Sequence, residues 1–257
     1  MDLSLITPYL ASILLYFVRV GAFFVALQFF GTQSDSKMVR LVLAFSIASM
    51  LWWVGGHPAL DLSGGLLHLA VRGLVEAVIG FAAGFVINLL TAAMGVAGEM
   101  ISHDMGFMMA RIMDPITGRS SPVMSQFFQS VVILLVFAMD LHHEFLRVLV
   151  VGFEVLPVGG GFNIDPVFER MTVLVSDAIE LGMRYAIPIM GVLVVLTAML
   201  VMLGRAVPNI NLMEFSFGAR ILLGIFASSY FIGEGTPFLR LIAVHILSGA
   251  RVLFVGA

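Results

Sequence analysis

Cysteine is absent from all 257 residues of the sequence, and charged residues are scarce. The lack of cysteine excludes disulfides, thiolate metal sites and thiol nucleophiles, although it says nothing about the redox compartment. Charged residues make up 11% of the chain, against about 25% in an ordinary soluble domain. Hydrophobic residues make up 60%, and the mean hydropathy is +1.08. This balance excludes a soluble globular enzyme and indicates a helical integral membrane protein.

Positive charge is also in short supply. The chain has 13 basic residues, all but one of them arginine, against 16 acidic residues, which gives a net charge of -3. No basic face is available to neutralise a nucleic-acid backbone, so we expect no nucleic-acid partner.

Nothing in the sequence divides the chain. The N-terminus has no positively charged stretch before its first apolar segment, which argues against a cleaved secretory signal. No Pro/Ser-rich linker, charge block or low-complexity tract follows. We therefore predict a single membrane domain over residues 1–257.

Apolar segments bounded by turn-forming residues predict an all-α, polytopic fold. The predicted segments are residues 8–30, 38–54, 66–100, 122–141, 165–204, 215–233 and 238–254. The third segment would span roughly 50 Å as a helix, well beyond a hydrocarbon core of about 30 Å, so it either tilts steeply or partly leaves the bilayer. Pro188 predicts a kink in the fifth.

Arginines lie inside or near these segments instead of clustering in loops on one side, so the positive-inside rule gives no topology. They are Arg19, Arg40, Arg72, Arg147, Arg220 and Arg240. A charge at the bilayer centre costs at least about 2.5–3.5 kcal/mol, so these groups should face protein, water or headgroups. Individual arginines can snorkel from helix ends. Taken together, they predict helices that are covered by other subunits or stand partly outside the hydrocarbon.

The third segment carries a stripe of small residues at helical spacing. Its glycines are Gly73, Gly80, Gly84, Gly95 and Gly98. Such a stripe lets two helix backbones approach closely in lipid, and we predict that it is a packing face. Leucine at Gly80 or Gly84 should then push a neighbouring helix away. Arg72 and Glu76 lie four residues apart at the foot of this segment and either form a charge pair or are both solvated beyond the membrane.

Two polar stretches are candidates for chemistry or gating. Residues 140–144 hold an Asp, two adjacent His and a Glu, but two adjacent helical histidines point about 100° apart, which favours a polar helix end over a metal site. Residues 102–122 hold several methionines among charged residues. This stretch is either a connecting loop or, because methionine repacks readily, a seal or constriction. We find no catalytic constellation and expect no enzyme activity, metal or cofactor.

Ordered motifs along nearly the whole chain resemble the FliR/SctT family of type III export-gate proteins. The motifs are Val18-Arg19-Val20, the glycine-rich third segment, Gly106-Phe107, Asp114-Pro115-Ile116-Thr117-Gly118, Leu141-His142-His143, Leu156-Pro157-Val158-Gly159, Ala186-Ile187-Pro188 and Gly204-Arg205-Ala206-Val207-Pro208-Asn209-Ile210-Asn211. Each motif alone is weak. Their order and spacing make the resemblance specific.

The resemblance implies a protein without chemistry of its own. Members of the family assemble with FliP and FliQ into a helical complex whose central pore passes unfolded flagellar substrates. The fold implied is a set of helical hairpins like a joined FliP and FliQ unit, partly raised above the bilayer of the bacterial inner membrane. Further partners implied are FlhB, FlhA, the basal-body ring and the proximal rod.

In the family, a loop between the middle helices plugs the closed pore. By position, it corresponds here to about residues 106–122. The plug residues expected from this position and from the methionine content are Met105, Gly106, Phe107, Met108, Met109, Arg111, Met113, Asp114 and Pro115.

Two other classes of function remain as alternatives. A small-solute transporter tends to show paired broken helices, whereas Pro188 has no counterpart in an equivalent earlier segment. A membrane-embedded enzyme would have only residues 140–144 as a candidate site. Stable co-purification with FliP-like and FliQ-like chains would favour the export gate over both.

Overall fold

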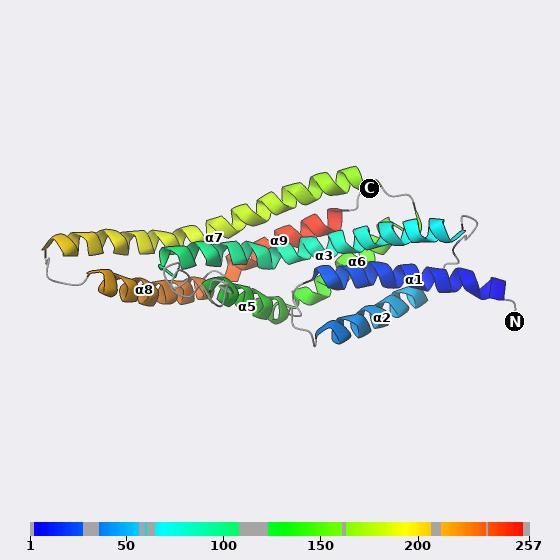
Figure 1. Cartoon of the computed structure of the whole chain (residues 1–257), viewed down its shortest axis with the longest axis horizontal. Coiled ribbons are helices and arrows are strands. Elements are labelled where there is room, and N and C mark those ends of the chain that lie inside the picture. The colour runs from blue at the N-terminus through cyan, green and yellow to red at the C-terminus, as the bar shows by residue number, and fades with distance from the viewer. Residues whose placement is uncertain are drawn as a thin grey trace. The chain divides into compact units, whose positions relative to one another are not determined.

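The computed structural model describes residues 3–27, 36–56, 60, 65–107, 123–160, 163–206, 212–234 and 236–253. These described residues form helices and no strand (Figure 1). The helices are α1 (Leu3–Ala26), α2 (Ser36–Val54), α3 (Gly65–Asp104), α5 (Val123–Ala138), α6 (Leu141–Val155), α7 (Ile164–Ala206), α8 (Leu212–Glu234) and α9 (Thr236–Val252). The predicted all-α fold is confirmed.

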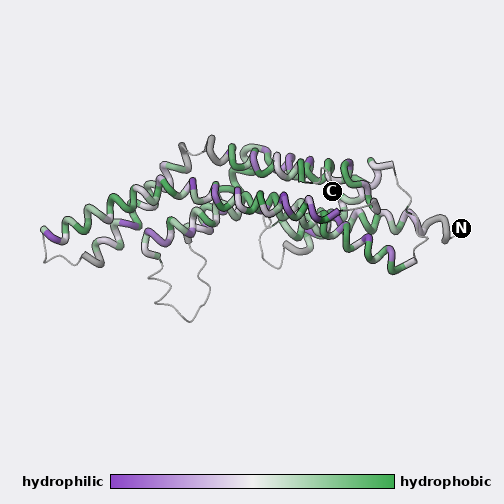
Figure 2. The backbone as a smooth tube through the Cα atoms, turned by 90° about the horizontal axis from the view of Figure 1, so that it is seen from above, coloured by the Kyte–Doolittle hydropathy of each residue, from purple (hydrophilic) through white to green (hydrophobic). Residues whose placement is uncertain are grey.

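Three helices among the described residues are long and apolar enough to cross a membrane, or four if the broken pair α5 and α6 counts as one span. The three are α1, α3 and α7. Figure 2 shows apolar residues along most of the described helices, with hydrophilic residues at scattered positions. Helix α3 has 40 residues and is about 60 Å long, so it is even longer than the sequence predicted.

Helix α6 is missing from the predicted segments, because the fourth segment was expected to continue to residue 141. The break falls at Asp140, whose backbone is left-handed with φ 56° and ψ 22°. Aspartate tolerates this region better than most residues other than glycine. The polar residues 140–144 therefore mark the start of a second helix, and a 15-residue helix is too short to be recognised as a span by its length.

Helix α7 begins one residue before the predicted Asp165-Pro166 start. The side chain of Asn163 accepts a hydrogen bond from the backbone N–H of Asp165 at 3.2 Å and caps the helix. Pro166 lies in the first turn, where a missing N–H costs nothing. The helix then continues through Pro188 to Ala206, and the kink at Pro188 stays a prediction.

Residues cluster into two compact units, and α3, α7 and α9 contribute to both. The first unit comprises residues 1–89, 140–175 and 245–257. In it, α1 packs along α2, where Trp52 Nε1 donates to Ser12 Oγ at 3.2 Å. Its buried apolar side chains include Leu15, Val20, Phe23, Ile79, Val86, Phe145, Val148 and Ile246.

The second unit comprises residues 90–139 and 176–244. Here α5 lies against the C-terminal part of α3, and α8 runs beside the C-terminal part of α7 (Figure 1). Its buried apolar side chains include Met94, Ala97, Ile101, Met105, Phe128, Val132, Ile189, Leu193 and Ile242. The prediction of one domain over residues 1–257 stays a prediction.

Candidate functional site

A buried ion pair lies at the centre of the first unit. Arg19 Nε of α1 donates a hydrogen bond to Glu76 Oε2 of α3. The two side chains are only 1% and 2% exposed. Removing such charges from water costs several kcal/mol per ion unless the geometry and the other hydrogen bonds compensate. The remaining contacts of the two side chains therefore decide whether the pair is stable.

Arg19 finds these contacts at the C-terminal end of α6. Its Nη1 donates to Leu156 O at 2.8 Å and to Gly152 O at 3.3 Å. The guanidinium carbon also lies 4.4 Å from the ring centre of Phe153. A cation at a helix C-terminus is stabilised by the carbonyl groups that the helix leaves unpaired, and the aromatic face adds a cation–π interaction.

Glu76 finds its second partner in the loop after α6. The backbone N–H of Gly159 donates to Glu76 Oε1 at 3.0 Å. Gly159 has φ +75°, a backbone conformation that favours glycine. The carboxylate thus has one partner on each oxygen, and the ion pair connects α1, α3, α6 and the loop that follows α6.

Sequence reasoning placed Glu76 beside Arg72 and did not pair it with Arg19. A signal was available, because Arg19 is the only charged residue of residues 3–26 and Glu76 the only acidic residue of residues 66–98. Two opposite charges in two apolar helices need a common partner. Arg72 is half-buried close to Gly159, and the Arg72–Glu76 pair stays a prediction.

The glycines of α3 lie against two different helices. In the first unit, a Cβ on Gly80 would overlap the carbonyl of Arg19, and one on Gly84 would overlap the carbonyl of Phe23. In the second unit, a Cβ on Gly98 would lie 2.5 Å from Ser125 Cα, and one on Gly95 would lie 2.7 Å from Gln129 Nε2. At Gly80, Gly84 and Gly98 the backbones approach too closely for even a methyl group, whereas the close atom at Gly95 is the end of a flexible side chain.

Gly73 differs from the other glycines of the stripe. A Cβ there would be 3.7 Å from Leu15 Cδ2, which is an ordinary contact. Sequence reasoning also missed Gly182 of α7, where a Cβ would overlap the carbonyl of Ala93 in α3. Gly182 lies four residues from both Ala178 and Ala186, so a small-residue spacing of the same kind was present in the sequence.

The first expected plug residues form the end of α3. Gly106 has φ +88°, and its N–H donates to His103 O at 3.0 Å, while Phe107 N–H donates to Ser102 O at 3.2 Å. This pair of hydrogen bonds is a Schellman motif, which commonly ends a helix at a left-handed glycine. Gly106 is therefore required by the helix end itself.

Met105 is fully buried at this helix end. A Cβ on Gly224 of α8 would lie 2.7 Å from the sulfur of Met105, so this side chain lies directly on the α8 backbone. Phe217 of α8 packs near Gly106, 3.5 Å from the place of a Cβ there. The other expected plug residues, Met108, Met109, Arg111, Met113, Asp114 and Pro115, lie outside the described residues.

Asp140, His142 and His143 form the one set of potential metal ligands found among the described residues. One ligand atom from each residue lies within 4.8 Å of the others. The His143 and Asp140 side chains are 67% and 77% exposed, with 3.9 Å between Nδ1 and Oδ1. Adjacent helical histidines thus converge more than the 100° argument implied, and the expectation of no metal here stays a prediction.

Replacing Glu76 by Ala should strongly destabilise the first unit, because Arg19 is left as an uncompensated buried charge. The expected loss is about 3–5 kcal/mol, measured as thermal unfolding of the full chain in mild detergent with any partners that co-elute. A double Arg19→Met, Glu76→Leu variant should recover most of that loss. The control is Glu180→Ala, which breaks an exposed pair with Arg184 and should cost less than about 1 kcal/mol. Equal effects of Glu76→Ala and Glu180→Ala would contradict this assignment.

Replacing Gly80 by Ala should destabilise the same unit by about 1–3 kcal/mol, because the methyl group forces α1 away from α3. The matched control is Gly191→Ala in α7, where a Cβ meets nothing within 4 Å. In that control, the higher helix propensity of alanine should leave stability unchanged or slightly raised. The measurement is the same unfolding midpoint, and a Gly80→Ala variant as stable as the control would refute the close contact.

Comparison with known proteins supports the resemblance seen in the motifs. Residues 10–240 match the family described as Bacterial export proteins, family 1. The Flagellar biosynthetic protein FliR of Bacillus subtilis (strain 168) is 27% identical over 207 residues, covering 78% of each chain.

The Escherichia coli (strain K12) protein of the same name is 30% identical over 221 residues, covering 82% of this chain and 81% of its own. The one from Buchnera aphidicola subsp. Schizaphis graminum (strain Sg) is 25% identical over 235 residues, covering 90% and 89%. In each comparison, most of the length of this chain and of its relative is matched. The chain belongs to family 1 of the bacterial export proteins, as its order of motifs predicted.

Proposed function

We propose that this chain is a subunit of the flagellar type III protein export gate and that it forms the pore for unfolded substrates together with FliP and FliQ. The observation that carries the proposal is the family match over residues 10–240, together with relatives named for flagellar biosynthesis. The same assignment puts the protein in the bacterial inner membrane, within the flagellar basal body. FlhB, FlhA, the basal-body ring and the proximal rod are then its neighbours.

The apolar surfaces of the helices support a role as a subunit of an assembly. Large apolar side chains are exposed along α2, including Met38, Val42 and Phe45, and along α8, including Leu222 and Phe226. Exposed apolar patches of this kind need lipid or another protein as a cover. The α2 helix is a short apolar helix of 19 residues, which fits a cover of neighbouring subunits at least as well as one of lipid.

The buried charges support a rigid scaffold without chemistry of its own. Arg19 Nε and Nη1 and both carboxylate oxygens of Glu76 are used in hydrogen bonds to each other and to backbone groups at the end of α6 and after it, while Arg19 Nη2 is buried without a partner in the described part of the chain. Neither group is open to a substrate. In the proposed gate, this ion pair holds the helices in place while a polypeptide passes.

Residues 106–122 are proposed to plug the resting pore. A passage wide enough for an unfolded chain would dissipate ion gradients, so the resting state requires a barrier that excludes water. The methionines of this segment suit a seal that yields to a passing polypeptide and then repacks. Two features fix the position at which this segment leaves α3: the Schellman motif at Gly106, and the packing of Met105 against Gly224 of α8.

Expression of the chain together with FliP and FliQ should yield a stable complex, whereas expression alone should yield aggregation or proteolysis. The reason is that its exposed apolar helices lack their cover in isolation. Size-exclusion chromatography with mass determination distinguishes the two outcomes. A monodisperse monomer that unfolds cooperatively in detergent would contradict the proposal and favour a self-contained transporter or enzyme.

Deleting residues 108–121 and bridging the gap with a short Gly/Ser linker should leave the complex assembled but make cells permeable to ions. This deletion preserves the Met105, Gly106 and Phe107 helix end, so the effect on α3 is minimal. Membrane permeability is read from dye or ion influx in cells that express the complex.

Two further variants separate the plug from a loop whose length alone matters. Replacing residues 108–121 by a Gly/Ser segment of equal length should also leak, because the apolar side chains are lost. Met108→Asp with Met109→Asp should leak more weakly. If the deletion variant assembles in normal amounts without increased permeability, residues 108–121 are an ordinary connection and not a plug.

A further inference from the structure

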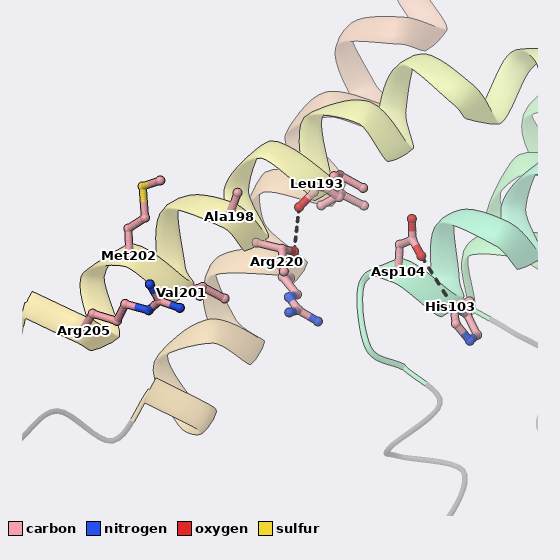
Figure 3. A pocket seen from close by; sticks show the side chains of 10 residues that line it. His103, Asp104, Leu193, Ala198, Val201, Met202, Arg205 and Arg220 are labelled. Carbon is pink, nitrogen blue, oxygen red and sulfur yellow. Dashed lines mark hydrogen bonds and ion pairs between the residues drawn. The ribbon is translucent and has the colours of Figure 1, made fainter. Parts of the chain in front are cut away.

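The second unit contains a groove with one apolar wall and two arginines in its lining (Figure 3). Its volume is about 670 Å³, within the usual range of ligand sites. The wall is formed by α7, from Leu193 to Met202, and the two arginines are Arg205 of α7 and Arg220 of α8. His103 and Asp104, at the end of α3, complete the lining.

Arg220 is the unusual member of this groove. Its Nε is buried and has no hydrogen-bond partner among the described residues. A guanidinium held beside apolar side chains requires an acceptor, and a negatively charged one is preferred. Asp104 is the acidic residue of the lining, and its Oδ1 lies 3.5 Å from His103 Nδ1. In Figure 3 the Arg205 side chain turns from α7 toward α8, and Arg220 lies farther along the wall, beside Leu193 and Ala198 and between Arg205 and Asp104.

The charge of the groove selects an occupant with a single negative charge. Two arginines against one aspartate leave a net charge of +1 when the histidine is neutral. A phosphate diester carries one negative charge, and the planar guanidinium binds phosphate oxygens with two hydrogen bonds at once. Basic pockets between membrane helices bind anionic lipid headgroups on this principle.

The apolar wall of the groove suits an acyl chain. The wall on α7 extends for about 14 Å from Leu193 to Met202, at the helical rise per residue. An acyl chain laid along this wall would contact Val194, Ala198 and Val201.

We propose that this groove binds one anionic glycerophospholipid, with its phosphate between Arg205 and Arg220 and an acyl chain along α7. The bound lipid would place its phosphate beside the Arg205 and Arg220 guanidinium groups and would cover exposed apolar side chains such as Met202. This site is independent of the pore and plug proposals, because it depends only on the groove within the second unit.

The test uses the full chain, purified in detergent with the partners that co-elute, and native mass spectrometry with added lipids. Phosphatidylglycerol should remain bound at one copy per chain at a collision energy that removes phosphatidylcholine from the complex. Inorganic phosphate should not displace it. Equal retention of both lipids would overturn the proposal, since the headgroup charge would then not matter for binding. Full displacement by phosphate would overturn it as well, since the acyl chain would then not contribute.

Three variants locate the lipid. Arg220→Gln should lower phosphatidylglycerol retention by about tenfold, because a charge-assisted hydrogen bond is lost. The matched control, Arg240→Gln, alters an exposed arginine outside the groove and should retain the lipid. Ala198→Trp keeps both arginines and fills the apolar wall, so it should also release the lipid. Circular dichroism checks that each variant is folded.

A photo-crosslinking amino acid at Val201 identifies what occupies the groove in the membrane. Crosslinks to phospholipid support the proposal. Crosslinks to a polypeptide, whether a partner subunit or another part of this chain, would overturn it. Unchanged lipid retention in both folded variants, Arg220→Gln and Ala198→Trp, would overturn it as well.

Discussion

The cost of a buried charge governs the first unit. Arg19 and Glu76 are removed from water, and neither could remain there without the other. Their side chains use the groups that a helix end and a turn leave unpaired, the carbonyls of Gly152 and Leu156 and the N–H of Gly159. The positions of α1, α3 and α6 in the first unit are therefore fixed by electrostatics as much as by apolar packing.

The same ion pair sets the register of the close helix contact. Glu76, Gly80 and Gly84 follow each other at four-residue steps on α3, and Arg19 and Phe23 do so on α1. The Arg19 side chain reaches Glu76 while its own carbonyl lies on Gly80, and the next carbonyl one turn on, that of Phe23, lies on Gly84. A shift of one turn would bury an unpaired charge and place side chains against backbone. Charge pairing and glycine packing thus favour one arrangement.

Two arginines illustrate two ways to hold a cation in an apolar environment. Arg19 is paired with Glu76 within its own unit, although its Nη2 is buried without a hydrogen-bond partner, whereas Arg220 keeps its buried Nε without a partner, in both cases among the described residues. The first arrangement yields a rigid scaffold. The second leaves an attraction for an anion from outside, next to an apolar wall. A subunit of a membrane export assembly has use for both, because its helices must hold their places while its surface is covered by lipid and by other chains.

Composition and hydrophobic length by themselves determined the helical membrane class, because the polar backbone groups of an apolar segment in lipid must form their hydrogen bonds within that segment. Helices α2, α8 and α9 agree with the predicted segments to within three residues at each end. The glycine spacing marked one face of α3, since helical periodicity is a local property.

Only the tertiary structure decided which side chains meet. Sequence distance offered Glu76 either a pair with Arg72 or a solvated position, whereas the structure buries Glu76 and its Oε2 accepts a hydrogen bond from Arg19, 57 residues away. The separate helix α6 depends on the left-handed backbone of Asp140, which its residue type allows but does not require. Gly80 and Gly98 lie on one stripe yet pack on α1 and α5 respectively. Sequence spacing fixes the direction of a side chain on its helix, but the partner comes from long-range packing, which no local pattern encodes.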